Sequence, residues 1–309
     1  MKSRRKSRVP ILPQKTKRFK YQEILLRFLK PALLPFLFFP LISGCSDNSP
    51  GRGPRDVLFA YGNGDGLYIL RGDGTLKQKV IGGYYYQPVL SPDKTKVACV
   101  YDKDFQITIF NLDGNFESQG KPKTVFNPQA LSQGSQMSSV CCPVWSTDGQ
   151  KVYFLNMNHL IVYDYQEKKA ASIFDFPDIQ TGGQTPETGN MKLSKDGGSL
   201  FCMLSEGKDK LAFWTISPGG NQGTQVANMD RGAFNGLKFP GELSGEFVER
   251  LFGSNENPKL GAITSTDNRY FFYFREETGF LAKQTIQGFD KTTKENFEVV
   301  AFGTSIYSK

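Results

Sequence analysis

The sequence predicts an all-β fold, a β-propeller of about five four-stranded blades with one helical insertion, and three observations support this prediction. Short runs of β-branched and aromatic residues are separated by Gly, Asp and Asn, with apolar residues recurring at a period of two. The chain contains 32 glycines and 13% aromatic residues, as expected of paired strands joined by tight turns. A strand–turn–strand core also recurs four times.

The amino-terminal segment predicts a signal peptide. Residues 1–30 contain eleven basic residues and one acid, and an uncharged apolar run occupies residues 32–42. A membrane-spanning helix needs about 20 apolar residues, so this run is too short to span a bilayer. A basic segment followed by a short apolar run is typical of a signal peptide.

The charge of the chain is concentrated in this leader. Residues 1–30 carry a net charge of +10, so the rest of the chain carries −2 of the overall +8. A nucleic-acid-binding domain needs its basic excess on the folded part, and we therefore expect no nucleic-acid partner. The single histidine, His159, argues against histidine-dependent catalysis and histidine-rich metal sites.

The leader ends in a four-residue motif that resembles the lipobox of bacterial lipoproteins, namely Ile42, Ser43, Gly44 and Cys45. The resemblance implies that residues 1–44 are cleaved off and that the Cys45 thiol carries a diacylglycerol anchor in the membrane. Ser46 follows the cysteine, which in this family implies the outer membrane in a host that has one. The alternative is a signal peptide without lipidation, cleaved near Gly44.

The mature chain is expected to consist of two parts. Residues 45–55 contain the lipidated cysteine and a polar stretch rich in Gly, Pro and Ser, which predicts a flexible tether. Residues 56–309 contain all the predicted strands and form the propeller domain.

The repeated core spans residues 88–101, 143–156, 191–204 and 262–275, and each copy predicts a strand, a Ser-x-Asp turn and a second strand. Successive serines are 55, 48 and 71 residues apart, and a further hairpin follows each core, so each unit has the four strands of a propeller blade. The aspartates are expected to accept hydrogen bonds from turn amides. The turn residues are Ser91 and Asp93, Ser146 and Asp148, Ser194 and Asp196, and Ser265 and Asp267.

These cores resemble the TolB-type propeller repeat. The third blade matches it best, through Pro143, Trp145, Ser146, Asp148, Gly149 and Lys151. The resemblance covers most of residues 56–301 and implies an architecture rather than an activity, since propellers host many functions.

The ends of the domain raise the question of how the ring closes. The first unit, residues 56–81, has no Ser-x-Asp core, so we expect its inner strand to come from the carboxyl terminus, residues 301–308. Such a shared strand would remove the unpaired edges of an open array. The alternative is an open β-array or a sandwich.

Residues 230–258 form an insertion before the last core. An amphipathic helix is predicted there, followed by Gly253 as its stop signal, unless the segment is a sixth, degenerate blade. The helix either packs on the propeller rim or docks a partner. Its apolar face contains Leu243, Phe247, Val248, Leu251 and Phe252.

Four cysteines follow Cys45. Cys99 and Cys202 each lie eight residues after a repeat serine, in the same place as Phe154 and Tyr273, so we expect them to pack as buried free thiols. The alternative is a disulfide, with Cys99 to Cys141 or Cys142 as the best candidate.

No catalytic, metal or cofactor site is predicted. The glycine- and aspartate-rich segments 62–66 and 71–74 lack the carboxylates of a calcium loop and are expected to be turns. His159 is expected to be a solvent-exposed turn residue without a partner.

We therefore expect a lipoprotein whose propeller binds a protein or another ligand at the cell envelope. The alternative is a propeller enzyme that acts on glycans or peptides at the cell surface.

Replacement of the predicted lipid attachment residue tests the anchor. The wild-type protein, expressed in a bacterium, should incorporate a fatty-acid analogue and stay with the membranes in a high-salt wash, because two or more acyl chains hold a protein stably. Cys45→Ala should not be labelled. Labelling of Cys45→Ala to the wild-type level would contradict the prediction.

Overall fold

The computed structural model describes residues 53–305, except for 63–64, 102–104, 128–139, 178–189, 208, 237, 257, 260–261, 266–268 and 278–281. Side chains are not described at 235, 276–277, 282–284 and 301–305. The predicted signal peptide, the lipobox and Cys45 therefore lie outside the described residues.

The described strands form five antiparallel sheets, each made of strands that are consecutive in sequence. The first sheet contains β1 (Leu58–Gly62), β2 (Gly66–Arg71) and β3 (Lys77–Gly82). The second contains β4 (Tyr85–Leu90), β5 (Lys96–Tyr101), β6 (Gln106–Leu112) and β7 (Ser118–Phe126). The third contains β8 (Val140–Trp145), β9 (Lys151–Asn156), β10 (His159–Asp164) and β11 (Lys169–Asp175).

The last two sheets follow the same order. The fourth contains β12 (Asn190–Leu193), β13 (Leu200–Glu206), β14 (Lys210–Ile216) and β15 (Gly223–Asp230). The fifth contains β16 (Ile263–Thr264), β17 (Tyr270–Glu277), β18 (Ala282–Asp290) and β19 (Glu295–Ser305). Five successive antiparallel sheets confirm the predicted five-bladed propeller.

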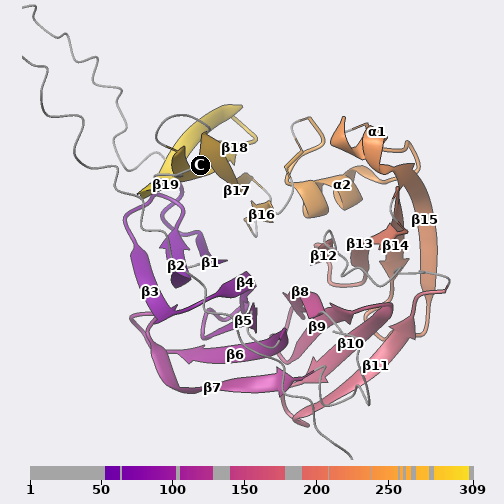
Figure 1. Ribbon diagram of the computed structural model, residues 1–309, viewed down its shortest axis with the longest axis horizontal. Coiled ribbons are helices and arrows are strands. Elements are labelled where there is room, and N and C mark those ends of the chain that lie inside the picture. The colour runs from indigo at the N-terminus through magenta and orange to yellow at the C-terminus, as the bar shows by residue number, and fades with distance from the viewer. Residues whose placement is uncertain are drawn as a thin grey trace, which may run out of the picture. The chain divides into compact units, whose positions relative to one another are not determined.

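The sheets are arranged as blades around a ring, with one strand of each blade nearest the centre (Figure 1). Along the inside of the ring, β1 contacts β4, β4 contacts β8, and β8 contacts β12. Apolar clusters fill the spaces between neighbouring blades; the fully buried Leu67 and Val97, for example, lie in the cluster between the first and second blades. Each blade therefore buries apolar side chains against its neighbours.

The predicted ring closure by a shared strand is wrong. The first blade has three strands, and residues 301–305 extend β19, where they pair with β18 of the fifth blade. Residues 306–308 of the predicted closing strand lie outside the described residues. The physical reason is local pairing: β18 and β19 form a hairpin across a short turn, which costs little loop-closure entropy.

Aromatic side chains instead join the first and last blades. The rings of Phe59 on β1 and Phe272 on β17 stack with their centroids 4.6 Å apart, and Phe297 packs edge-on against Phe272. Leu70, Ile286 and neighbouring residues complete this apolar cluster. The ring is closed at this seam by side-chain packing between the first and fifth blades.

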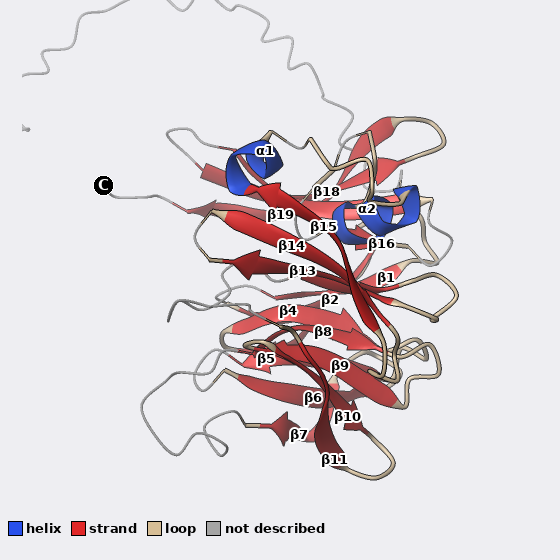
Figure 2. Cartoon of the chain, turned by 90° about the vertical axis from the view of Figure 1, so that its right-hand side faces the viewer, coloured by secondary structure: helices blue, strands red, loops and turns tan. Residues whose placement is uncertain are grey.

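Two short helices lie between the fourth and fifth blades (Figures 1 and 2): α1 (Arg231–Asn235) and α2 (Gly245–Phe252). The predicted helix is confirmed as α2, which begins where Ser244 Oγ accepts a hydrogen bond from the Phe247 amide and ends at Gly253, φ 83°. The five-residue α1 was not predicted. The possible sixth blade is wrong, since the described part of the insertion contains helices and no sheet.

The helix α2 occupies the arc of the ring that a further blade would fill. Its apolar face, including Phe247 and Leu251, is buried against Phe201 and Phe213 of the fourth blade. At its end, Gly253 comes so close to Phe271 of the fifth blade that a Cβ atom would lie 2.8 Å from the ring. The insertion therefore packs against both neighbouring blades, and its apolar face is not available to a partner.

A pair of substitutions on β17 tests the aromatic seam. Phe272 is 1% exposed, whereas Phe274, two residues along the same strand, is 44% exposed. Phe272→Ala should lower the free energy of unfolding by about 3–5 kcal/mol, because it leaves a cavity between the blades. Phe274→Ala should change it by no more than about 0.5 kcal/mol. Chemical denaturation of the purified protein measures both, and equal small effects would show that the seam does not hold the ring.

Candidate functional site

The Ser-x-Asp turns share one set of hydrogen bonds. The serine hydroxyl donates to the aspartate carboxylate at 2.6 Å in Ser91–Asp93, 2.5 Å in Ser146–Asp148 and 2.6 Å in Ser194–Asp196. The same hydroxyl oxygen accepts the backbone amide five residues later, at 2.8 to 2.9 Å. Ser265 accepts the Tyr270 amide in the same way, at 2.9 Å, and Asp267 lies outside the described residues.

Each described aspartate also accepts a backbone amide within its own turn, from Thr95, Gln150 or Gly198. The turns need a left-handed residue, which is Lys94 (φ 61°), Gly149 (φ 69°) or Gly197 (φ 75°). The hydrogen bonds to the carboxylates lower the pKa of Asp148 and Asp196 below the ordinary value. These residues join the first two strands of the second, third and fourth blades, and their polar groups are used within the turn.

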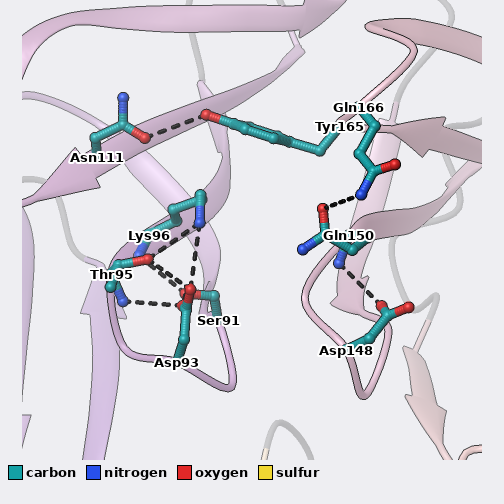
Figure 3. Close-up of polar contacts among 9 residues, drawn as sticks. All are labelled: Ser91, Asp93, Thr95, Lys96, Asn111, Asp148, Gln150, Tyr165 and Gln166. Atoms are coloured by element: carbon teal, nitrogen blue, oxygen red, sulfur yellow. Dashed lines mark hydrogen bonds and ion pairs between the residues drawn. The ribbon is translucent and has the colours of Figure 1, made fainter.

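Polar contacts in the same region also connect the second and third blades (Figure 3). Tyr165 donates to Asn111 at 3.3 Å, and the Lys96 ammonium lies 5.3 Å from the centre of the Tyr165 ring. Lys96 also pairs with Asp93 at 3.3 Å. Because the charges and rings here are paired with one another, this cluster is structural.

His159 is exposed but has a partner, which corrects the expectation of an unpartnered histidine. Its Nδ1 lies 2.6 Å from an oxygen of Asp175, the residue paired with it across β10 and β11. The histidine contact and a hydrogen bond from Ser172 lower the pKa of Asp175. Sequence spacing does not show this pair, because a register shift in the hairpin brings the two residues opposite each other.

All four cysteines of the described chain are free and buried. Cys99 lies between the first and second blades, whereas Cys141, Cys142 and Cys202 lie between the third and fourth, so the structure does not contain the considered Cys99 disulfide. Cys99 and Cys202 occupy the same packing position in their blades as Phe154, each 0% exposed, as the repeat alignment predicted. Burial raises the pKa of the Cys202 thiol, which keeps it neutral and unreactive.

Exposed aromatic side chains form the best candidate binding surface. The large hydrophobic residues exposed in the described chain are Tyr84 (56%), Tyr86 (43%) and Phe274 (44%). The ring of Tyr61 stacks on Phe274 with the centroids 6.3 Å apart. Tyr61, Tyr84, Tyr86 and Phe274 are called the aromatic surface below.

Strand direction places these residues on the face opposite the Ser-x-Asp turns. Tyr84 directly precedes β4 and Tyr86 lies near its start, and β4 then runs toward its turn. Phe274 lies in the second half of β17, which runs away from its turn. Tyr61 is near the end of β1, and the adjacent Gly62 lies directly against the Tyr85 carbonyl. Three successive blades therefore bring aromatic residues to one face of the ring. These residues were not predicted as a site, although the run of three tyrosines at positions 84–86 was a visible signal.

Other features of the described chain are weaker candidates for a functional site. A depression of about 190 Å³ on the fifth blade is lined by Arg269, Tyr270 and Asp290, but the Arg269 guanidinium is held by Asp290 at 2.7 Å. Among the described residues, no three His, Cys, Asp or Glu side chains are grouped as metal ligands. No helix in the described part of the chain is long and apolar enough to span a membrane.

No family model and no curated protein matches the sequence. Similar solved structures include TolB from Acinetobacter baumannii, with 14% identity, a TM-score of 0.42, and coverage of 78% of this chain and 51% of that one. A putative TolB from Agrobacterium tumefaciens has 13% identity, a TM-score of 0.41 and coverage of 83% and 82%. A putative 6-phosphogluconolactonase from Bacteroides uniformis ATCC 8492 has 13% identity, a TM-score of 0.39 and coverage of 82% and 69%. The chain spans about half of the first of these proteins.

The carboxylates of the turns predict a dependence of stability on pH. Asp148 has a lowered pKa in the fold, so its contribution to stability is present above the unfolded pKa of about 3.9 and is lost as the pH falls through the folded pKa. Stability should therefore decrease below about pH 4, and Asp148→Asn should weaken this decrease. The exposed Glu167→Gln is the control and should leave it unchanged. Urea unfolding at pH 3 to 7 measures the effect, and identical pH profiles for all three proteins would contradict it.

Proposed function

We propose that this protein is an exported, lipid-anchored binding protein whose propeller recognises a protein or another ligand of the cell envelope through the aromatic surface. The observation that supports the proposal most directly is the exposure of Tyr84, Tyr86 and Phe274 on one face of the ring. Single exposed apolar residues are ordinary, but several on one face are characteristic of an interaction site.

Aromatic side chains suit this purpose for a physical reason. Tyrosine and phenylalanine offer a large contact area with only two side-chain torsions to immobilise, so binding costs them little entropy. Tyr61 is half-buried, and its burial raises its pKa to about 12, which keeps its hydroxyl neutral beside Phe274. The stack of Tyr61 and Phe274 therefore offers a preformed, uncharged platform, and the exposed tyrosine hydroxyls add polar contacts at its border.

The expected anchor supports a partner in the envelope. The lipobox-like residues Ile42 to Cys45 imply attachment to a membrane, and residues 46–55 are a polar, glycine- and proline-containing tether. A ring held by such a tether can turn any of its faces toward a neighbouring envelope component.

Site-specific photocrosslinking tests the proposed surface. A photoreactive phenylalanine analogue placed at Tyr84 or Phe274 of the full-length protein in its own bacterium should give one discrete crosslinked product. The same analogue at Gln119, an exposed residue of the outer strand β7, is the matched control and should give none. Unmodified wild-type protein should compete with the photoreactive protein and reduce the yield of the crosslinked product. An unmodified copy that carries Tyr84→Ala and Phe274→Ala should compete about tenfold or more weakly.

Two results would count against the proposal. Equal crosslinking at Gln119 and Tyr84 would indicate contact without recognition. Release of sugar or peptide fragments from purified envelope material, abolished by Tyr84→Ala, would favour the enzymatic alternative.

A further inference from the structure

The fourth blade departs from the repeat at one position that faces its neighbour. Two residues before the repeat serine, the second, third and fifth blades have Val89, Val144 and Ile263. Each of these packs into the apolar cluster shared with the next blade around the ring. The fourth blade has Lys192 instead, and its next neighbour is the helix α2.

The helix brings a second cation to the same place. Arg250 on α2 donates from Nε to the Leu193 carbonyl at 2.8 Å, which fixes the guanidinium beside the strand that carries Lys192. Asn190 on the same strand donates to the Leu251 carbonyl at 2.9 Å, so two hydrogen bonds hold α2 against β12. Figure 1 shows α2 and β12 next to each other on the inner side of the ring.

Neither cation forms an ion pair with a described carboxylate. The negative charge of Glu246 acts on Arg250 without forming an ion pair with it. The Glu246 carboxylate instead accepts a hydrogen bond from the Lys195 backbone amide at 2.9 Å. Glu249, the other acid of α2, is 3.5 Å from the Lys291 ammonium. The Lys192 ammonium makes no hydrogen bond with the described residues, and the nearby Cys142 thiol is kept neutral by burial, which raises its pKa.

Two neighbouring cations without an ion-paired carboxylate are unfavourable in this half-buried place. Burial and the charge of Arg250 both lower the pKa of Lys192. A valine at this position, as in the second and third blades, would avoid both costs. An anion placed between the two side chains would offset the repulsion between them.

We propose that Lys192 and Arg250 form a binding site for the anionic group of a small ligand, a carboxylate or a phosphate, at the inner junction of the fourth blade and α2. The guanidinium offers a planar set of donors that matches either group, and the ammonium supplies a mobile point charge. Lys192 and Arg250 are both partly accessible to solvent, so a ligand can reach them without opening the blade. The site is separate from the aromatic surface and does not depend on its function.

Two substitutions that restore the residue of the third blade provide the test. Lys192→Val introduces the counterpart of Val144, and Lys195→Thr introduces the counterpart of Thr147, three residues further on. Each removes one positive charge from the same blade. Inorganic phosphate and malonate are titrated into the full-length protein in mild detergent at constant ionic strength, with chloride as the reference.

Phosphate, malonate or both should raise the melting temperature of the wild type more than chloride does, and the effective anion identifies the group that the site prefers. Lys192→Val should weaken this effect by about tenfold or more in anion concentration, and Lys195→Thr should retain it. Without anion, Lys192→Val should melt at or above the wild-type temperature.

The proposal fails if neither anion exceeds chloride in the wild type, or if Lys192→Val responds as the wild type does. If Lys192→Val does not fold, the rate at which a chemical reagent acetylates each lysine of the wild type provides a second test. The effective anion should slow the modification of Lys192 and not that of Lys195, and equal rates with and without it would overturn the proposal.

Discussion

The two apolar faces of every blade must both be covered, and this constraint determines the rest of the structure. A four-stranded sheet with apolar residues on both faces is stable only between two neighbours, so the blades form a ring. Cys99, Phe154 and Cys202 illustrate the rule, since they occupy one repeat position and each is fully buried against the preceding blade. The ring must continue until the last exposed face meets the first.

Five blades meet this requirement here with the help of a helix. The face of the fourth blade that points toward the fifth contains Phe201 and Phe213 and is covered by α2. Phe271 of the fifth blade packs on the other side of the same insertion. The last face then meets the first through Phe59 and Phe272. Since side chains cover every face, the ring needs no shared strand, and the first blade keeps only three. The exposed rings of Tyr86 and Phe274 belong to the two blades that flank this three-stranded blade.

Local features of this fold could be predicted from the sequence, whereas long-range features could not. The Ser-x-Asp spacing indicates the blades because the turn is stabilised by residues within six positions of one another, and α2 is marked by its apolar spacing and by Gly253. The pairing of residues 301–305 depends on whether β18 or a strand more than 200 residues away offers the better partner, which no local pattern encodes. The aromatic surface and the Arg250 contact with Leu193 likewise arise only when distant segments meet.

A repeated fold offers its own way to separate structural residues from candidate ligand-binding ones. Ser91, Ser146 and Ser194 recur with equivalent partners at 2.5 to 2.6 Å, so their polar groups are explained by the turn that their blades share. A polar residue that stands where the other blades have an apolar one has no such explanation. Lys192 is that exception, and it occurs where the neighbouring blade is replaced by a helix that carries Arg250. A valine at this position would avoid placing a charge beside Arg250, and the proposed anion gives the lysine a role that packing does not.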